Sequence, residues 1–238
     1  MFKTLTSVLA GLAAAAVTSA AYAAPVIYFG ENQNPGNAVS GDPLTARNSF
    51  LSSLVGVGSE SFESYSAGTG APLPISFPGS GGGINATLNG QGGITSGLSV
   101  GRFNTTSGGS KYWEVSGTFD ITFSSAISAF GFYGTDIGDF NGNITLALTD
   151  VNDVVTNLLV PNTLNGNNAS LLFYGFIDTT NSYKKISFGN TNAGTDFFGF
   201  DDMVIGDREQ VVEVPEPATL ALVGLSLFGI AATRRRRR

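Results

Sequence analysis

Between residues 24 and 213, short apolar segments alternate with segments rich in glycine, asparagine and serine, and this pattern predicts strands. Apolar and polar residues alternate with a period of two in residues 119–123 and 144–148, as in half-buried strands. Residues 127–133 are apolar at nearly every position, which is typical of a central strand that is buried on both faces. Similar segments are 26–29, 59–64, 84–88, 93–100, 112–115, 154–160, 171–177, 185–188 and 197–205.

About ten short strands separated by turn residues predict an all-β fold, an antiparallel β-sandwich or jelly roll. One short helix is expected near its N-terminal side. Asp42 can cap this helix, Pro43 suits its first turn, and apolar residues recur at helical spacing until Gly56. Residues 72–83, rich in proline, glycine and serine, are expected to form a loop.

Residues 1–23 have the three parts of a secretory signal peptide. Lys3 gives a basic start, residues 5–17 form an apolar segment, and Ala21 and Ala23 are the small residues that signal peptidase requires. Cleavage is therefore expected before Ala24, and the protein is expected to be exported.

The C-terminal segment contains three features in a fixed order. Pro215, Glu216 and Pro217 hold the backbone extended and precede an uncharged apolar segment, residues 218–232. As a helix this segment is roughly 22 Å long, and starting at Pro217 it can cross a membrane if the basic side chains after it reach the surface. By the positive-inside rule the terminal arginines would be a cytoplasmic anchor: Arg234, Arg235, Arg236, Arg237 and Arg238.

This tail resembles the PEP-CTERM sorting signal of envelope proteins from Gram-negative bacteria that make exopolysaccharide. The resemblance covers about the last 25 residues and implies recognition by an exosortase. That membrane transpeptidase would cut near Pro215–Pro217 and release or re-attach the preceding domain. The chain then divides into a signal peptide (1–23), an extracellular domain (24–213) and a sorting and anchor segment (214–238).

Composition narrows the possible chemistry. The chain has no cysteine and no histidine, which excludes Ser–His–Asp and Cys–His triads and zinc sites built on those ligands. Residues 24–214 contain 6 basic and 17 acidic side chains, a formal charge of −11. This charge disfavours nucleic acid as a partner, because phosphate contacts require a basic surface.

Carboxylate pairs are the catalytic groups that remain, since glycoside hydrolysis needs only two facing carboxyl groups. Glu63, Glu114 and Asp120 are candidates, but nothing in the local sequence selects a pair. We therefore interpret them as solvated residues of strands and expect no catalytic residue and no enzyme activity. A polysaccharide-active enzyme that uses carboxylates alone is the alternative.

Residues 134–143 concentrate oxygen ligands in one glycine-rich loop. Calcium binds six to eight such oxygens, which makes a calcium site possible at Asp136, Asp139, Asn141 and Asn143. The loop is not an EF-hand, because Ile144 occupies the position where an EF-hand requires glycine. The alternative is an ordinary turn whose side chains bond their own backbone. Alternation in a strand would place Asp201 and Asp202 on opposite faces, so only one could join this site.

The strand-rich region also loosely resembles lectin-like or carbohydrate-binding sandwich domains, through residues 61–65 and 199–206. Five aromatic residues could supply a sugar platform, although core packing is the better interpretation of Trp113: Tyr112, Trp113, Tyr133, Tyr174 and Tyr183. Together these features predict a non-catalytic matrix or surface protein associated with exopolysaccharide or biofilm. A structural coat protein without a ligand is the other non-catalytic possibility.

Overall fold

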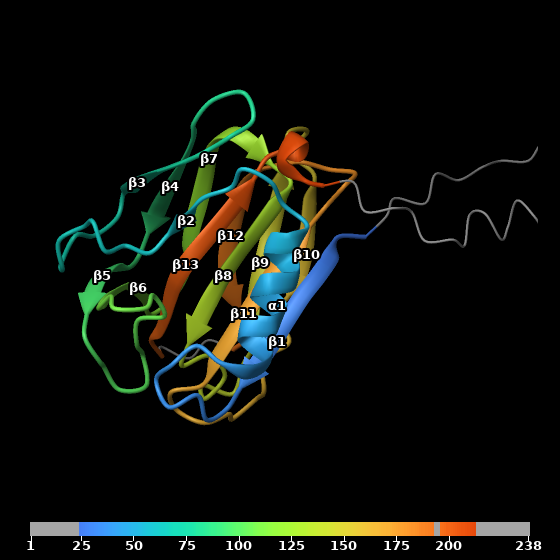
Figure 1. The fold of residues 1–238 in the computed structure, drawn as a ribbon. Coiled ribbons are helices and arrows are strands. Elements are labelled where there is room, and N and C mark those ends of the chain that lie inside the picture. The colour runs from blue at the N-terminus through green and yellow to red at the C-terminus, as the bar shows by residue number, and fades with distance from the viewer. Residues whose placement is uncertain (1–23, 193–195, 213–238) are drawn as a thin grey trace, which may run out of the picture.

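The structure, a computed structural model, describes residues 24–192 and 196–212. The predicted signal peptide and sorting segment lie outside this range. The described residues form two antiparallel β-sheets that pack face to face, with one helix on the outside of one sheet (Figure 1). The predicted all-β sandwich with one N-terminal helix is therefore confirmed.

The seven-stranded sheet contains the longest fully buried strands. Its central strand β8 (Ala129–Thr135) and its neighbour β11 (Leu171–Ile177) are buried at every residue, as predicted for residues 127–133. In spatial order its strands are β1 (Val26–Asn32), β11, β8, β13 (Phe198–Gly206), β6 (Lys111–Val115) and β5 (Gly93–Ser96). A short strand, β2 (Ser59–Glu60), pairs with β13 as well.

The six-stranded sheet alternates buried and solvent-facing residues, because only one of its faces meets the core. Its strands in spatial order are β10 (Val155–Leu159), β9 (Ile144–Asp150), β12 (Tyr183–Asn190), β7 (Phe119–Ile127), β4 (Ile84–Gly90) and β3 (Leu73–Phe77). Between the sheets, aromatic rings fill the core. Phe119 stacks on Phe188 at 4.3 Å between ring centroids, and Phe132 lies 4.8 Å from Phe200.

Helix α1 (Gly41–Ser52) lies against β1 and β11 on the outer face of the seven-stranded sheet. Phe50 is its anchor, fully buried and in contact with Tyr28 and Phe173. The ring fits because the strands below contain Gly131 and Gly175, where a Cβ atom would lie within about 3 Å of it.

Two local predictions were wrong. Ser40, not Asp42, occupies the N-cap of α1, and its side chain makes no capping hydrogen bond. The expected loop at residues 72–83 contains strand β3, in which Leu73, Ile75 and Phe77 are buried. Pro74 is tolerated there because β3 is an edge strand, where a missing N–H interrupts no ladder.

The strand predicted at residues 59–64 is also shorter than expected. It stops after Glu60, because Phe62 has a left-handed backbone (φ 58°) that turns the chain. Its ring is fully buried and packs near Trp113.

The two ends of the described chain lie at the same end of the sandwich (Figure 1). β1 starts there at Val26, and Val211 pairs with Leu54 just after α1. The connection from β1 to α1 and the loop after β8 lie at the opposite end, because β1 and β8 run away from the chain ends.

Candidate ligand-binding cleft

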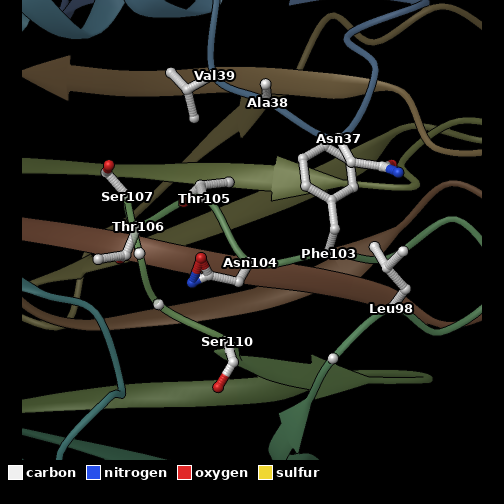
Figure 2. A pocket seen from close by; sticks show the side chains of 13 residues that line it. Asn37, Ala38, Val39, Leu98, Phe103, Asn104, Thr105, Thr106, Ser107 and Ser110 are labelled. Atoms are coloured by element: carbon white, nitrogen blue, oxygen red, sulfur yellow. The ribbon is translucent and has the colours of Figure 1, made fainter.

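An open cleft of about 510 Å³ lies over the outer face of the seven-stranded sheet. One wall is the segment 37–39 that leads into α1, and the other is the loop 97–110 between β5 and β6. Figure 2 shows Ala38 and Val39 on the first wall, with the ring of Phe103 extending toward Asn37. The lining contains no charged residue; it consists of asparagine, serine, threonine and glycine with the apolar side chains of Ala38, Val39, Leu98 and Phe103.

Asp201 on β13 fixes the threonine wall of the cleft. One of its carboxylate oxygens accepts hydrogen bonds from the Thr105 N–H (2.7 Å), the Thr105 hydroxyl (2.9 Å) and the Thr106 N–H (3.3 Å). Asp201 itself is only 1% exposed. Since buried carboxylates require partners, this network holds residues 105 and 106 in one conformation.

Asp202 holds the same two threonines. Its two oxygens accept from the hydroxyl groups of Thr105 (3.1 Å) and Thr106 (3.0 Å). The expectation that Asp201 and Asp202 point to opposite faces was therefore wrong. A β-bulge interrupts β13 between Asp201 and Val204, and Asp202 has φ 47°, so the alternation of faces breaks.

Glu63 supports the other part of the loop. One of its oxygens accepts from the backbone N–H groups of Ser110 (2.7 Å) and Lys111 (2.6 Å) and from the amide of Asn104 (3.2 Å). Three carboxylates from outside the loop thus fix its conformation by accepting hydrogen bonds from residues that line the cleft.

Burial raises the pKa of Asp201 to about 8, and the charge of Asp202 acts in the same direction. The hydrogen bonds from Thr105 and Asp202 oppose this shift without cancelling it. Near neutral pH Asp201 therefore carries less negative charge than an ordinary aspartate.

Arg102 joins the cleft loop to the end of the sandwich that carries the predicted calcium residues. Its guanidinium contacts Glu114 at 2.6 Å and Asp136 at 3.1 Å, and donates to the carbonyl of Val100 at 3.0 Å. Its side chain is 9% exposed and its charge lies 5.4 Å from the ring centroid of Phe197. The arginine is therefore a buried cross-link between β6, β8 and the loop.

The four predicted calcium ligands lie in one loop but point to different partners. Asp136 accepts from Arg102 and from the N–H of Ala169. Asn141 accepts from the amide of Asn165, and the Asn143 amide donates to the carbonyls of residues 160 and 162. Within residues 24–192 and 196–212, no three acidic side chains are arranged as a metal-binding group.

Asp139 differs from the other three. One of its oxygens is buried without a hydrogen-bond partner, and Asp196 lies next to it. Burial, followed by the contact with Asp196 and the charge of Asp136, raises the pKa of Asp139 to about 7. Among the described residues this oxygen has no partner, so a cation can contact it.

The carboxylates considered for catalysis are engaged separately. Glu63 binds loop N–H groups, Glu114 binds Arg102, and Asp120 pairs at 3.0 Å with Lys185 on the six-stranded sheet. The aromatic residues considered for a sugar platform are buried, with at most 2% exposure: Tyr112, Trp113, Tyr133, Tyr174 and Tyr183. Core packing, the preferred interpretation of Trp113, is confirmed.

The cleft was not predicted from the sequence. Residues 104–110 contain only Asn, Thr, Ser and Gly, a composition that indicates a loop but not its ligand. The available signal was Asp201 and Asp202 together in an otherwise apolar strand, because buried acids require donors from elsewhere in the chain.

Comparison with known proteins identifies the C-terminal segment. Residues 213–237 match the family described as the PEP-CTERM protein-sorting motif. The chain therefore carries a PEP-CTERM protein-sorting motif at its C-terminal end. The motif indicates an exported protein whose membrane-anchored precursor is processed by an exosortase. Within the described part of the chain, no helix has the length and apolar character needed to cross a membrane.

No curated protein sequence matches the PEP-CTERM chain. The K2 adhesin domain of Lys-gingipain is similar over 63% of this chain and 97% of its own, with 14% identity and a TM-score of 0.38. A family 22 carbohydrate-binding module of Clostridium thermocellum Xyn10B is similar over 65% of this chain and 94% of its own, with 14% identity and a TM-score of 0.38. A DUF4465 family protein from Bacteroides ovatus is similar over 76% of this chain and 98% of its own, with 10% identity and a TM-score of 0.33. The assignment of the sandwich rests on the strand pairing described above.

Proposed function

We propose that this PEP-CTERM protein is a non-catalytic protein of the cell surface or extracellular matrix, and that its cleft binds neutral segments of exopolysaccharide. The observation that supports this most is the lining of the cleft. Uncharged hydroxyl and amide groups stand beside Val39, Leu98 and Phe103, which matches the alternating polar and apolar surfaces of a sugar.

The rigidity of the cleft supports the same proposal. Asp201, Asp202 and Glu63 lie outside the cleft and hold the loop by accepting its hydrogen bonds. A ligand therefore does not have to order the loop, and the entropic cost of binding is reduced. The formal charge of −11 on residues 24–214 favours a neutral polymer over an acidic one.

Affinity electrophoresis of the exported protein through gels containing neutral or acidic polysaccharides tests this. Neutral polymers should retard the protein, and Ala38→Trp, which fills the cleft from its exposed wall, should abolish the retardation. Ser76→Trp adds the same side chain on exposed β3 and is the matched control. Equal retardation of both variants would exclude the cleft as the binding site, and no retardation by any polymer would favour a ligand-free coat protein.

We infer that the protein is non-catalytic because Glu63, Glu114 and Asp120 are each held by a different structural partner. A reducing-end assay on the same polysaccharides tests this. Release of new ends that is lost in Glu63→Gln or Glu114→Gln would establish the carboxylate-dependent enzyme instead.

We further propose that the ends of the precursor are removed as the sequence predicts. Signal peptidase would cut after Ala23, and exosortase would cut near Pro215–Pro217 after the apolar segment has held the precursor in the inner membrane. Mass spectrometry of the extracellular protein should then find Ala24 at the N-terminus. An extracellular peptide that contains residues 220–234 would contradict the processing.

Calcium at the loop of residues 136–143 is a separate proposal. It is supported by the unpartnered oxygen of Asp139 beside Asp196. Millimolar calcium should raise the melting temperature of the exported protein relative to EDTA, and Asp139→Ala should remove the difference. Identical melting curves in calcium and EDTA would rule out a stabilising site.

A further inference from the structure

The two lateral edges of the sandwich differ in how their backbone groups are protected. At one edge, residues 68–70 cover β5: Gly68 N–H donates to the Ile94 carbonyl and Ile94 N–H donates to the Thr69 carbonyl, both at 2.8 Å. The other strand at this edge, β3, contains Pro74, which cannot donate to an added strand. Both strands of this edge are therefore blocked.

The opposite edge is formed by β1 and β10, and it has none of these protections. β1 pairs with β11 on one side and with no other described strand. It contains no proline, lysine or arginine, and its one charged residue, Glu31, accepts hydrogen bonds from the N–H and hydroxyl groups of Thr163. Val26 and Ile27 are 50% and 41% exposed, and Val155 and Leu159 on β10 are similarly exposed.

A groove lies between β1 and α1, next to the unpaired edge. It has a volume of about 530 Å³ and is formed by residues 27–31 and by α1. The helix contributes the small side chains of Thr45, Ala46 and Ser49 to its wall. An added strand would pair with the backbone of β1 and place alternate side chains in this groove.

We propose that the strand added here is β1 of a second copy, so that two protomers join their seven-stranded sheets by antiparallel β1–β1 pairing. The sequence of β1 fits a register centred on Phe29. In this register Tyr28 lies opposite Gly30 and Ile27 lies opposite Glu31, so the two glutamates do not face each other. The interface is symmetric and closes as a dimer.

Sedimentation velocity of the exported protein over a range of concentrations tests the dimer, and two variants test its register. Ile27→Glu places a second carboxylate opposite Glu31 twice per dimer and should raise the dissociation constant by about tenfold or more. Ile27→Lys places an ammonium there and should leave the dimer intact. Val100→Glu, an equal charge change at a 75% exposed position outside this edge, is the control and should have no effect.

Cross-linking gives an independent readout that does not depend on how well the charged variants fold. The chain has no cysteine, so introduced thiols have no competitors. The double variant Ile27→Cys, Glu31→Cys should oxidise to a covalent dimer, because directly opposed residues in antiparallel strands have suitable Cα separations. Each single variant should stay uncross-linked, and residues 27 and 31 are too far apart along one strand to bridge within a chain.

A protein that stays monomeric at all concentrations and gives no cross-link would overturn the proposal, and would be the result if another segment of the chain covers β1. A dimer that survives Ile27→Glu, or one that Val100→Glu disrupts equally, would overturn the assignment to this edge. These outcomes are independent of polysaccharide binding, which uses the cleft.

Discussion

The two outer faces of the sandwich are built on different principles. On the seven-stranded sheet, α1 and the loop 97–110 cover the strands, and the charged groups of Arg102 and Asp201 beneath the loop are buried and paired. On the six-stranded sheet, most outward side chains of β4, β7, β9 and β12 are short and polar, and these are at least partly exposed: Asn85, Thr87, Asp120, Thr122, Ser124, Thr145, Thr149 and Ser187.

The same chemical groups therefore have different energetic roles on the two faces. A carboxylate beneath the loop must keep its partners, because water cannot replace them. A carboxylate on the six-stranded sheet can exchange its partner for water at little cost. We expect mutations to separate the faces by the size of their effects, and matched substitutions test this directly.

The largest difference in the free energy of unfolding is expected between substitutions of Arg102 and Lys185. Arg102→Ala leaves the buried Asp136 and the mostly buried Glu114 without their partner and should lower the free energy of unfolding by about 3–5 kcal/mol. Lys185→Ala breaks the exposed pair with Asp120 and should cost about 0–1 kcal/mol. Urea unfolding of both variants measures the two values, and similar costs would contradict the distinction between the faces.

The next effect concerns the carboxylate under the cleft. Asp201→Ala removes the acceptor of three bonds from Thr105 and Thr106 and should cost about 2–3 kcal/mol. Hydrogen exchange at these two amides should rise as the loop is released. Asp120→Ala on the other face is the control. Unchanged protection in Asp201→Ala would show that the loop does not depend on this carboxylate.

The pH dependence of stability should also come from the face of the seven-stranded sheet that α1 and the loop 97–110 cover. Asp201 has a pKa of about 8 in the folded protein, whereas an unfolded aspartate has one of about 4. Between these values the folded state binds more protons, so stability should fall as pH rises from about 5 to about 8. Thermal melts should show this decrease, and Asp201→Asn, which cannot ionise, should reduce its slope and leave the contribution of Asp139, whose pKa is raised to about 7. An equally steep curve in that variant would assign the effect to other groups.

The smallest difference is expected between two threonines. Thr106→Ala loses the hydroxyl bond to Asp202 and should cost about 1 kcal/mol. Thr122→Ala, on the exposed face of β7, should stay within about 0.5 kcal/mol of the parent protein. Urea titrations of the two variants in parallel resolve this difference. A larger cost for Thr122→Ala would mean that the six-stranded sheet is covered by a partner.

Much of the fold was predictable because most strands have a local signature. Strand β11 matches the predicted residues 171–177, and the uninterrupted apolar sequence near residue 130 gave the central strand β8. Strand β3 was not predicted because proline usually indicates a loop, although Pro74 is compatible with an edge strand. The local pattern of apolar and polar residues thus predicts buried central strands better than edge strands.

The candidate cleft was not predictable in the same way, since its geometry depends on contacts between distant residues. Thr105 and Asp201 are 96 positions apart in the chain. The bulge that turns Asp202 toward Thr106 is a departure from the alternation on which the prediction relied. The calcium prediction used spacing within one loop, which cannot show that Asp136 is taken by Arg102 from another loop.

The position of the chain ends sets how the molecule can face its surroundings. The first and last described residues share one end of the sandwich, and the segment 37–39 of the cleft lies toward the other (Figure 1). Strands of seven residues span about 23 Å. A membrane attachment through residues after Val212 would raise the cleft by roughly that height above the lipid surface. A long polymer could then thread past a row of such proteins without approaching the anionic headgroups.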